Sequence, residues 1–302
     1  MTYKSLKELE SQVFKKATKK RVVAVAEAGD SHVLEAVREA VNIGLVDALL
    51  YGKKAKVREK LQALGENPAD YELIDSASPE QSALMAGIAT KEGRADFILK
   101  GLIQTGTLLK NLFREEAGFR TGRLISHMNI MELSSYPKLL ALTDAAVNLT
   151  PGLAQKKDIL LNAVDTLARM GIDNPKVAVL SSAETVNEKL PDSVDAAALK
   201  AMNQSGEISG CIVEGPISYD LAICQEAAAT KGYDSPVAGQ ADLLLCPNII
   251  TGNTLLKALR HSAGALTAGL VVGGRVPVVL TSRASSAADK YRTMVMAASA
   301  TM

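Results

Sequence analysis

Short apolar runs alternate with longer, more polar segments along the first hundred residues of the chain. The apolar runs are rich in Val, Ile, Leu and Ala, which is typical of buried strands. The segments between them have the composition of helices. The pattern predicts strands at Arg21–Ala26, Asp47–Tyr51, Tyr71–Asp75 and Asp96–Leu99, and helices at about 31–42, 53–64 and 79–92. This alternation predicts an α/β fold in which helices cover both faces of a mainly parallel sheet.

The second half of the chain continues the alternation after a long apolar run at Leu124–Leu133. Pro137 separates this run from a second one at Lys138–Thr143, so we expect the two strands to form a hairpin-like pair. Further strands are predicted at Lys176–Leu180, Cys211–Glu214, Asp242–Cys246 and Val276–Leu280, and helices at about 155–170, 193–202, 219–230, 251–262 and 287–300. The amino-terminal residues predict one more helix, on the surface, because apolar side chains recur at helical spacing there (Leu6, Leu9, Val13, Phe14).

Length and composition exclude several classes of function. The 302 residues suffice for two domains, and 47% hydrophobic with 22% charged residues is typical of a globular protein. A net charge of +1 and the absence of Trp argue against binding of nucleic acid. No apolar run is long and uninterrupted enough to span a bilayer, and the amino terminus lacks the features of a signal peptide. We therefore expect a cytoplasmic protein with neither nucleic acid nor membrane as a partner.

The cysteines and histidines predict neither a disulfide framework nor a metal site. The three cysteines are widely spaced in mostly apolar runs and suggest reduced, buried thiols (Cys211, Cys224, Cys246). The three histidines lie far apart, without the spacing of a metal-binding motif (His32, His127, His261).

A strand, a loop and a helix near the carboxyl end form the strongest candidate for a site. The strand at Val276–Leu280 leads through Ser282 and Arg283 to a helix that begins near Ala287. The first N–H groups of a helix lack partners within the helix and favour an anion, and an Arg adds a fork that suits phosphate. Two ordinary interpretations remain open. Ser286 and Asp289 fit a helix-capping pattern, and Arg283 fits a solvated loop residue.

Other candidate residues follow predicted strands. Lys100 and Gly101 end the strand at Asp96–Leu99, where ligands bind in sheets of this kind, although a Lys at a strand end is more often simply solvated. Ser126 and His127 are neighbours on one strand, so their side chains point to opposite faces and cannot pair with each other. Asn253 opens a helix and is explained equally well as a cap.

Several of these segments resemble one protein family. Ser282-Arg283 with Asp289, after the strand Pro277–Leu280, resembles the carboxyl-terminal motif of phosphate acyltransferases, which include phosphotransacetylases and, closer here, phosphate butyryltransferases. Lys100-Gly101 followed by Thr105-Gly106 and Lys110 resembles a second family segment, and Thr143-Asp144 to Asn148 a third. The resemblance extends over nearly the whole chain.

The resemblance implies an architecture. Members of this family have two three-layer α/β/α domains with mainly parallel sheets and a cleft between them, an arrangement similar to isocitrate dehydrogenase. Carried over to this sequence, one domain comprises 1–130 plus 284–302, and the other, inserted, comprises 131–283.

The resemblance also implies a reaction, the reversible transfer of a short acyl group between coenzyme A (CoA) and inorganic phosphate. Butyryl or a branched C4–C5 acyl group is expected, in a homodimer or higher homo-oligomer. By the same resemblance Arg283 binds phosphate, Ser282 stabilises the intermediate and Asp289 acts as a base toward the thiol. The implied substrate-binding residues are Lys100, Gly101, Thr105, Gly106, Lys110, Ser126, His127 and Asn253. CoA and phosphate are substrates, and no cofactor is expected.

Three alternatives stay open. Phosphate acetyltransferase differs only in the acyl group. An oxidoreductase of the isocitrate dehydrogenase type would need a carboxylate cluster for a metal and a nucleotide-binding loop, and neither pattern occurs in the sequence. The third alternative is a non-catalytic CoA-binding module. Loss of Ser282 or Arg283 would favour it, but both residues are present.

Overall fold

The computed structural model describes residues 2–281 and 285–302. The chain forms two compact units. The central unit contains the residues up to Glu8 together with Leu124–Thr267, and the terminal unit contains Leu9–Arg123 together with Ala268–Met302. The domain boundaries expected from the sequence stay a prediction.

The terminal unit is built on a sheet whose strands lie in the order β3-β2-β1-β4-β11-β10. The first five of these strands run parallel to one another. The sixth, β10, is antiparallel to β11. The strands are β1 (Arg21–Ala26), β2 (Val46–Gly52), β3 (Glu72–Asp75), β4 (Phe97–Lys100), β10 (Leu266–Val272) and β11 (Val278–Val279). The predicted parallel α/β alternation is confirmed here by the parallel pairing of β3, β2, β1, β4 and β11.

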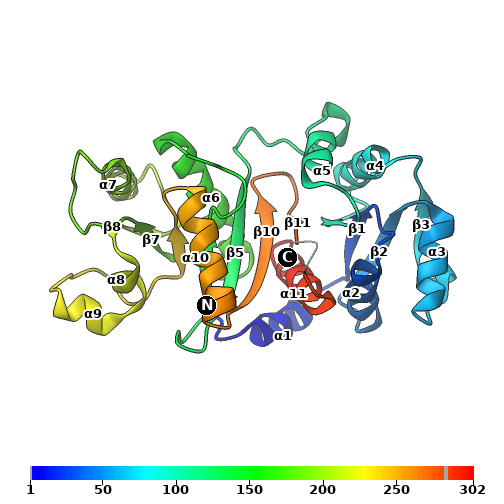
Figure 1. Cartoon of the computed structure of the whole chain (residues 1–302), viewed down its shortest axis with the longest axis horizontal. Helices are drawn as coiled ribbons and strands as arrows, with labels where there is room; N and C mark the ends of the chain where they lie inside the picture. The colour runs from blue at the N-terminus through cyan, green and yellow to red at the C-terminus, as the bar shows by residue number, and fades with distance from the viewer. Residues whose placement is uncertain (1, 282–284) are drawn as a thin grey trace. The chain divides into compact units, whose positions relative to one another are not determined.

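Helices cover both faces of this sheet. Helices α4 and α5 lie on one side, and α2, α3 and α11 lie on the other (Figure 1). The helices that lie wholly or partly in this unit are α1 (Leu6–Lys16), α2 (Ser31–Asn42), α3 (Lys54–Ala63), α4 (Pro79–Lys91), α5 (Thr105–Leu112) and α11 (Ala287–Ser299), with short 3-10 turns η1 (Pro68–Asp70) and η2 (Glu115–Ala117). Side-chain caps fix several helix starts: Asp30 accepts the Val33 N–H at 2.9 Å, and Ser78 caps α4.

The strand order creates a switch point in the terminal unit. The chain runs outward from β1 to β2 and β3, then returns to place β4 on the other side of β1. The loops that follow β1 and β4 therefore leave the sheet side by side, while the helices to which they lead, α2 and α5, lie on opposite faces (Figure 1). Ligands of doubly wound sheets bind at such a point, outside the carboxyl ends of the strands.

The central unit combines a hairpin with a parallel sheet. Strands β5 (Ser126–Glu132) and β6 (Leu140–Thr143) are antiparallel, which confirms the hairpin predicted around Pro137. Parallel pairing then continues in the order β6-β9-β7-β8. The remaining elements are β7 (Lys176–Leu180), β8 (Ile212–Ile217), β9 (Leu243–Leu245), α6 (Leu153–Arg169), α7 (Pro191–Gln204), α8 (Tyr219–Ile223), α9 (Gln225–Thr230) and α10 (Ile249–Ser262). Apolar side chains from β6, β7 and β9 form the core with α8 and α10.

Three features differ from the sequence-based expectations. Strand β10 is not predicted. The single helix expected over 219–230 is two helices, because the N–H groups of Gly239 and Ala241 bond to the carbonyls of Leu221 and Ala222 and extended backbone at Cys224 breaks the helix. Cys224 is exposed at this break, whereas Cys211 and Cys246 are buried as expected. In the part of the chain that is described, no helix is long and apolar enough to cross a membrane.

Candidate functional site

A cavity of about 410 Å³ lies at the switch point of the terminal unit. Its lining comes from the loops after β1, β4 and β11 and from the first turn of α11. Two lysines and one aspartate supply its charges. The lining residues are Asp30, Val33, Lys100, Gly101, Leu102, Ile103, Gln104, Thr281 and Lys290. The cavity therefore lies where the fold is expected to bind a ligand, and cations of this unit face it.

Backbone contacts between the loops after β1 and β4 fix one wall of the cavity. The N–H of Gly101 donates to the carbonyl of Ala26 at 2.9 Å, and the N–H of Leu102 donates to that of Glu27 at 2.8 Å. A Cβ at Gly101 would lie 2.0 Å from the Glu27 carbonyl oxygen, so only glycine fits. The preceding Lys100 is the last residue of β4 and is 7% exposed.

The first turn of α11 supplies the opposite wall. Ser286 and Asp289 form the predicted capping box, in which each side chain accepts the backbone N–H of the other at 3.1 Å. Asp289 also pairs with Arg292 at 2.6 Å. The carboxylate of Asp289 is thus held by the helix start and by an arginine, and its role as a base stays a prediction.

Lys290 is a residue of this site that the sequence analysis did not assign. Its side chain is 4% exposed, and its Nζ donates to the Ser285 carbonyl at 2.7 Å. Burial lowers the pKa of Lys290, and the nearby charges of Asp30 and Asp289 oppose that shift. The only sequence signal was its place directly after Asp289 in the carboxyl-terminal motif.

The other candidates of the terminal unit do not all reach the cavity. Thr105, Gly106 and Lys110 lie on α5, and none of these three is among the described residues that line it. Gln104, which precedes α5, does line it. Ser282 and Arg283 lie outside the described residues.

A second group of candidates lies in the central unit, on β5. The Oγ of Ser126 accepts a hydrogen bond from Asn162 at 3.2 Å, while His127 Nδ1 lies 3.0 Å from Asn129 Nδ2. The two neighbours have different partners, as alternation along a strand requires. Burial lowers the pKa of His127, and this effect outweighs the opposite influence of Asp144. His127 is therefore a neutral imidazole near neutral pH.

Asp144 organises the loop that follows β6. Its carboxylate accepts the N–H groups of Ala146 and Val147 at 2.8 and 3.0 Å and the amide of Asn148 at 2.6 Å. Asn253 Nδ2 donates to the Ala145 carbonyl at 2.9 Å and joins α10 to this loop. Asn253 is not the cap of α10. That role belongs to Asn248, which accepts the N–H of Thr251 at 3.0 Å.

A second cavity, of about 640 Å³, lies at the carboxyl ends of β7, β8 and β9 in the central unit. Hydroxyl groups and apolar side chains alternate around it. Its lining residues are Leu180, Ser181, Ser182, Asp192, Ser218, Tyr219, Pro247, Thr251, Thr254, Leu255 and Ala258. This cavity was not predicted, because its hydroxyls come from three separate segments of the chain.

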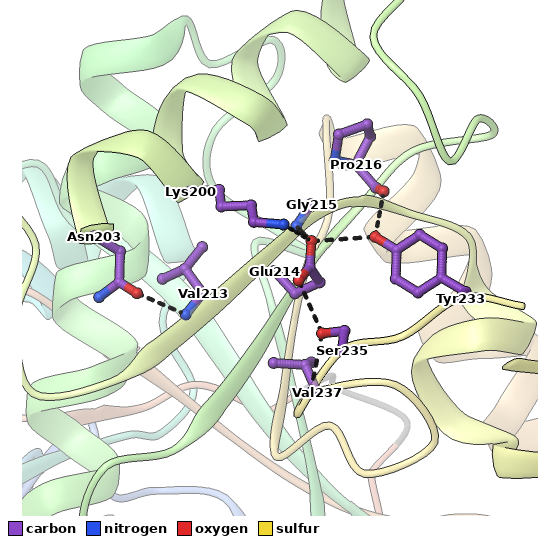
Figure 2. A network of polar contacts seen from close by, with 9 residues as sticks. All are labelled: Lys200, Asn203, Val213, Glu214, Gly215, Pro216, Tyr233, Ser235 and Val237. Carbon is purple, nitrogen blue, oxygen red and sulfur yellow. Dashed lines mark hydrogen bonds and ion pairs between the residues drawn. The ribbon is translucent and has the colours of Figure 1, made fainter. Parts of the chain in front are cut away.

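A buried carboxylate on β8 is the centre of a polar network in the same unit. Figure 2 shows Glu214 between Lys200, Tyr233 and Ser235. Its oxygens accept hydrogen bonds from Lys200 at 2.6 Å, from Tyr233 at 3.1 Å and from Ser235 at 2.8 Å. Tyr233 also donates to the Pro216 carbonyl at 2.9 Å. The network thus ties β8 to α7 and to the loop after α9.

The sequence of this chain matches a known protein family. Residues 79–298 match the family described as phosphate acetyl/butaryl transferase. The chain belongs to this family. Membership confirms the resemblance seen in the motifs and makes the chain an acyltransferase that uses phosphate.

Members of both branches of the family are similar to this chain. The phosphate butyryltransferase of Clostridium acetobutylicum is 41% identical over 295 residues, which are 98% of this chain and 97% of that protein. The phosphate acetyltransferase of Thermotoga maritima is 40% identical over 280 residues, which are 93% and 95% of the two chains. The crystal structure of a branched-chain phosphotransacylase from Enterococcus faecalis is 31% identical, with a TM-score of 0.84, and the match covers 93% of this chain and 99% of that one. The α/β fold is therefore the fold of phosphotransacylases.

The described part of the chain holds no cluster of metal ligands. Among residues 2–281 and 285–302, no group of three or more His, Cys, Asp or Glu side chains is placed to hold a metal ion. The two buried cysteines are poor nucleophiles, because burial raises the pKa of Cys211 to about 11 and that of Cys246 to about 12.

Proposed function

We propose that this acyltransferase moves a short acyl group reversibly between CoA and inorganic phosphate, with butyryl or a branched C4–C5 acyl group preferred. The observation that carries the proposal is the switch-point cavity. Lys100 and Lys290 face it. Thr281, the residue directly before Ser282 and Arg283, also lines it. Phosphate and acyl phosphate are anions, and two lysines at the carboxyl edge of a parallel sheet attract them.

The proposed roles follow the family motifs. Arg283 binds phosphate through a bidentate, charge-assisted contact, and Ser282 donates to the oxyanion of the tetrahedral intermediate. Asp289 is the proposed base toward the thiol. The proposed substrate-binding residues are Lys100, Gly101, Thr105, Gly106, Lys110, Ser126, His127 and Asn253. No acyl-enzyme is needed, which agrees with the buried, weakly acidic thiols.

The acyl group distinguishes the proposal from phosphate acetyltransferase. Relatives with both names match the chain, and their identities differ little, so the preference for butyryl rests on the motif and on the branched-chain phosphotransacylase. A pocket that accommodates the longer chain gains about 0.8 kcal/mol per buried methylene, or about a fourfold preference each.

The proposal extends to the molecular setting. No cofactor takes part, and CoA and phosphate are the small-molecule partners. The protein is a homodimer or higher homo-oligomer in the cytoplasm, and its domains comprise 1–130 plus 284–302 and 131–283.

One assay tests the proposed function. Release of CoA is followed with straight-chain C2 to C6 and branched C4–C5 acyl-CoAs, with and without phosphate. We expect turnover that requires phosphate and a kcat/KM for butyryl-CoA or a branched substrate above that for acetyl-CoA. A higher value for acetyl-CoA contradicts the butyryl assignment but leaves the reaction class intact. Absence of phosphate-dependent turnover with every substrate contradicts the reaction class.

A further inference from the structure

Asp289, the proposed base toward the thiol, is held by an arginine of its own helix. Arg292 lies one turn further along α11, and its Nη2 donates to Asp289 Oδ1 at 2.6 Å. The pair is largely shielded from water, because the side chains of Arg292 and Asp289 are 25% and 14% exposed. Water therefore screens this contact less than it screens a pair on the surface.

Two contacts fix the plane of the Asp289 carboxylate. Oδ2 accepts the backbone N–H of Ser286 at 3.1 Å, and Oδ1 accepts the hydrogen bond from Arg292. With one contact alone the carboxylate could turn about its bond to Cβ, whereas donors on both oxygens hold it in one orientation. The two contacts use two of the about four lone-pair sites of a carboxylate, so they do not by themselves prevent Asp289 from accepting a proton.

The stability of the helix alone does not explain Arg292. Its Nε is buried and has no hydrogen-bond acceptor among the described residues. An ion pair three residues apart stabilises a helix only slightly, whereas a buried N–H without an acceptor costs more than such a pair contributes. Arg292 is also not among the described residues that line the switch-point cavity. What it does contact is the carboxylate that the proposed reaction needs.

The proposed reaction depends on the orientation of this carboxylate. Pairing with a guanidinium favours the charged form, which can accept a proton, but it also makes Asp289 a weaker base. The benefit is therefore orientation, because a proton is transferred efficiently only to a lone pair that points at the donor. A misplacement of about 1 Å can lower a rate by about 100-fold.

We propose that Arg292 is a positioning residue, which holds the Asp289 carboxylate in the orientation in which it takes the proton of the CoA thiol. This inference rests on the proposed function, in which Asp289 is the base. With acyl phosphate as the donor, the S–H proton moves to a carboxylate oxygen of Asp289 and the sulfur forms a bond to the carbonyl carbon. The bond from that carbon to the phosphate oxygen breaks, and phosphate leaves with the electron pair. The reverse direction returns the proton to the thiolate, and the guanidinium stays charged throughout.

Two substitutions of Arg292 test the positioning role. Arg292→Met keeps an unbranched stem without a donor, and we expect kcat to fall by about 10-fold to 100-fold in both directions, with the KM for phosphate within about threefold of the wild type. Arg292→Lys keeps a cation that can reach one oxygen, so it should recover part of the loss.

Arg94→Met is the matched control. Arg94 belongs to the same unit, and its Nη2 also lies 2.6 Å from a carboxylate oxygen, that of Glu72, but these side chains are 50% and 55% exposed. Because water screens this pair, kcat of Arg94→Met should stay within about twofold of the wild type.

A double-mutant cycle shows whether Arg292 acts through Asp289. Asp289→Asn removes the base but keeps a side-chain oxygen for the N–H of Ser286, and it should lower kcat by about 100-fold or more. If Arg292 acts through this carboxylate, Arg292→Met should lower kcat by less than about threefold in the Asp289→Asn protein. A loss of the same size in both backgrounds identifies a structural role and overturns the proposal.

The outcomes distinguish this inference from the proposed function. Wild-type kcat in Arg292→Met, together with an impaired Asp289→Asn, overturns the inference alone. Wild-type kcat in Asp289→Asn contradicts the proposed role of Asp289 and the inference with it. A wild-type protein without phosphate-dependent turnover contradicts the proposed reaction, on which the inference rests.

Chemical rescue takes the place of the cycle if the double variant is too slow to measure or Arg292→Met folds poorly. Arg292→Ala is then assayed with added guanidinium, at concentrations well below those that unfold the protein. Recovery of kcat by about fivefold or more, with an unchanged KM for phosphate, supports the proposal. No recovery by guanidinium, with no recovery in Arg292→Lys, overturns it.

Discussion

Arg283 carries the phosphate-binding part of the proposal at the scale of a single residue. It lies outside the described residues, between Thr281 at the cavity edge and Ser285, which bonds to Lys290. Charge-assisted hydrogen bonds contribute about 1.5–3 kcal/mol each, so Arg283→Ala should lower kcat/KM for phosphate by about 10-fold to 100-fold or more. Steady-state kinetics with phosphate varied measures this. Arg283→Lys should restore only part of the loss, because a point charge cannot replace the fork.

The same experiment distinguishes binding from folding. An arginine whose role is to bind phosphate contributes little to stability, so the melting temperature of Arg283→Ala should stay close to that of the wild type. Unchanged phosphate kinetics in this variant would place Arg283 outside the site and remove the main support for the motif assignment.

Burial of His127 should make the stability of the protein depend on pH. Burial lowers its pKa in the folded protein, so below the ordinary value of about 6.5 the unfolded chain binds more protons than the folded one. Stability should therefore fall as the pH drops from about 7 through about 5.5, and it should fall less in His127→Gln. Urea unfolding at the two pH values measures the difference. The control is His261→Gln, which removes an exposed histidine instead of a buried one.

Gly101 fixes the switch point at the scale of an element. A Cβ there would lie 2.0 Å from the Glu27 carbonyl oxygen and 2.7 Å from that of Ala26, and both are backbone atoms that cannot move aside separately. Gly101→Ala should therefore cost about 2–3 kcal/mol of unfolding free energy and push the loops after β1 and β4 apart. Chemical denaturation measures this loss of stability. Turnover should also fall, because the substitution displaces Lys100.

Gly106 is the matched control for stability. It lies in the first turn of α5, and a Cβ added there would meet no atom of the described residues within 4 Å. Gly106→Ala should be neutral or stabilising by up to about 1 kcal/mol. Equal stability losses in the two variants would show that the close approach at Gly101 is not responsible.

Glu214 joins β8 to α7 and to the loop after α9 through one carboxylate (Figure 2). It is 6% exposed and accepts hydrogen bonds from Lys200, Tyr233 and Ser235. Glu214→Ala leaves these donors without their acceptor, and we expect a loss of about 2–4 kcal/mol in unfolding free energy. Denaturant unfolding monitored by circular dichroism is the measurement.

An exposed pair of the same type is the control for Glu214. Glu207 lies 2.6 Å from Lys157, and its side chain is 52% exposed. Glu207→Ala should cost less than about 1 kcal/mol, because water and salt screen such a pair. A similar small loss in Glu214→Ala would show that the buried network contributes little to the fold.

The whole molecule is nearly neutral, with a net charge of +1, so binding of anionic substrates depends on where its cations lie rather than on its total charge. Lys100 and Lys290 supply that local charge at the switch-point cavity. Because the proposed reaction needs only protein side chains, CoA and phosphate, extensive treatment with EDTA should leave turnover unchanged. Loss of activity that a divalent ion restores would contradict this prediction.

The sequence by itself determined the class of fold, most of the helices and strands, and the family. Apolar runs and helix signals are local, so their alternation along the chain predicts strands and helices without knowledge of neighbours. Ser286 and Asp289 show this well, since the capping pattern three residues apart forms as predicted. The motif around Ser282, Arg283 and Asp289 identified the family for the same reason, because its residues are close in sequence.

Only the tertiary structure decided which of these residues face one cavity. The order β2-β1-β4-β11 brings the loops that hold Asp30, Lys100 and Thr281 together, and no local pattern encodes that order. Lys290 looks like a solvated residue in the sequence, and only packing against the sheet buries it, with no ion-pair partner among the residues that the structure describes. The break in the helix at Cys224 has the same origin, since distant N–H groups compete for its carbonyls. Contacts between residues far apart in the chain depend on the packed fold, and that is why they had to be observed.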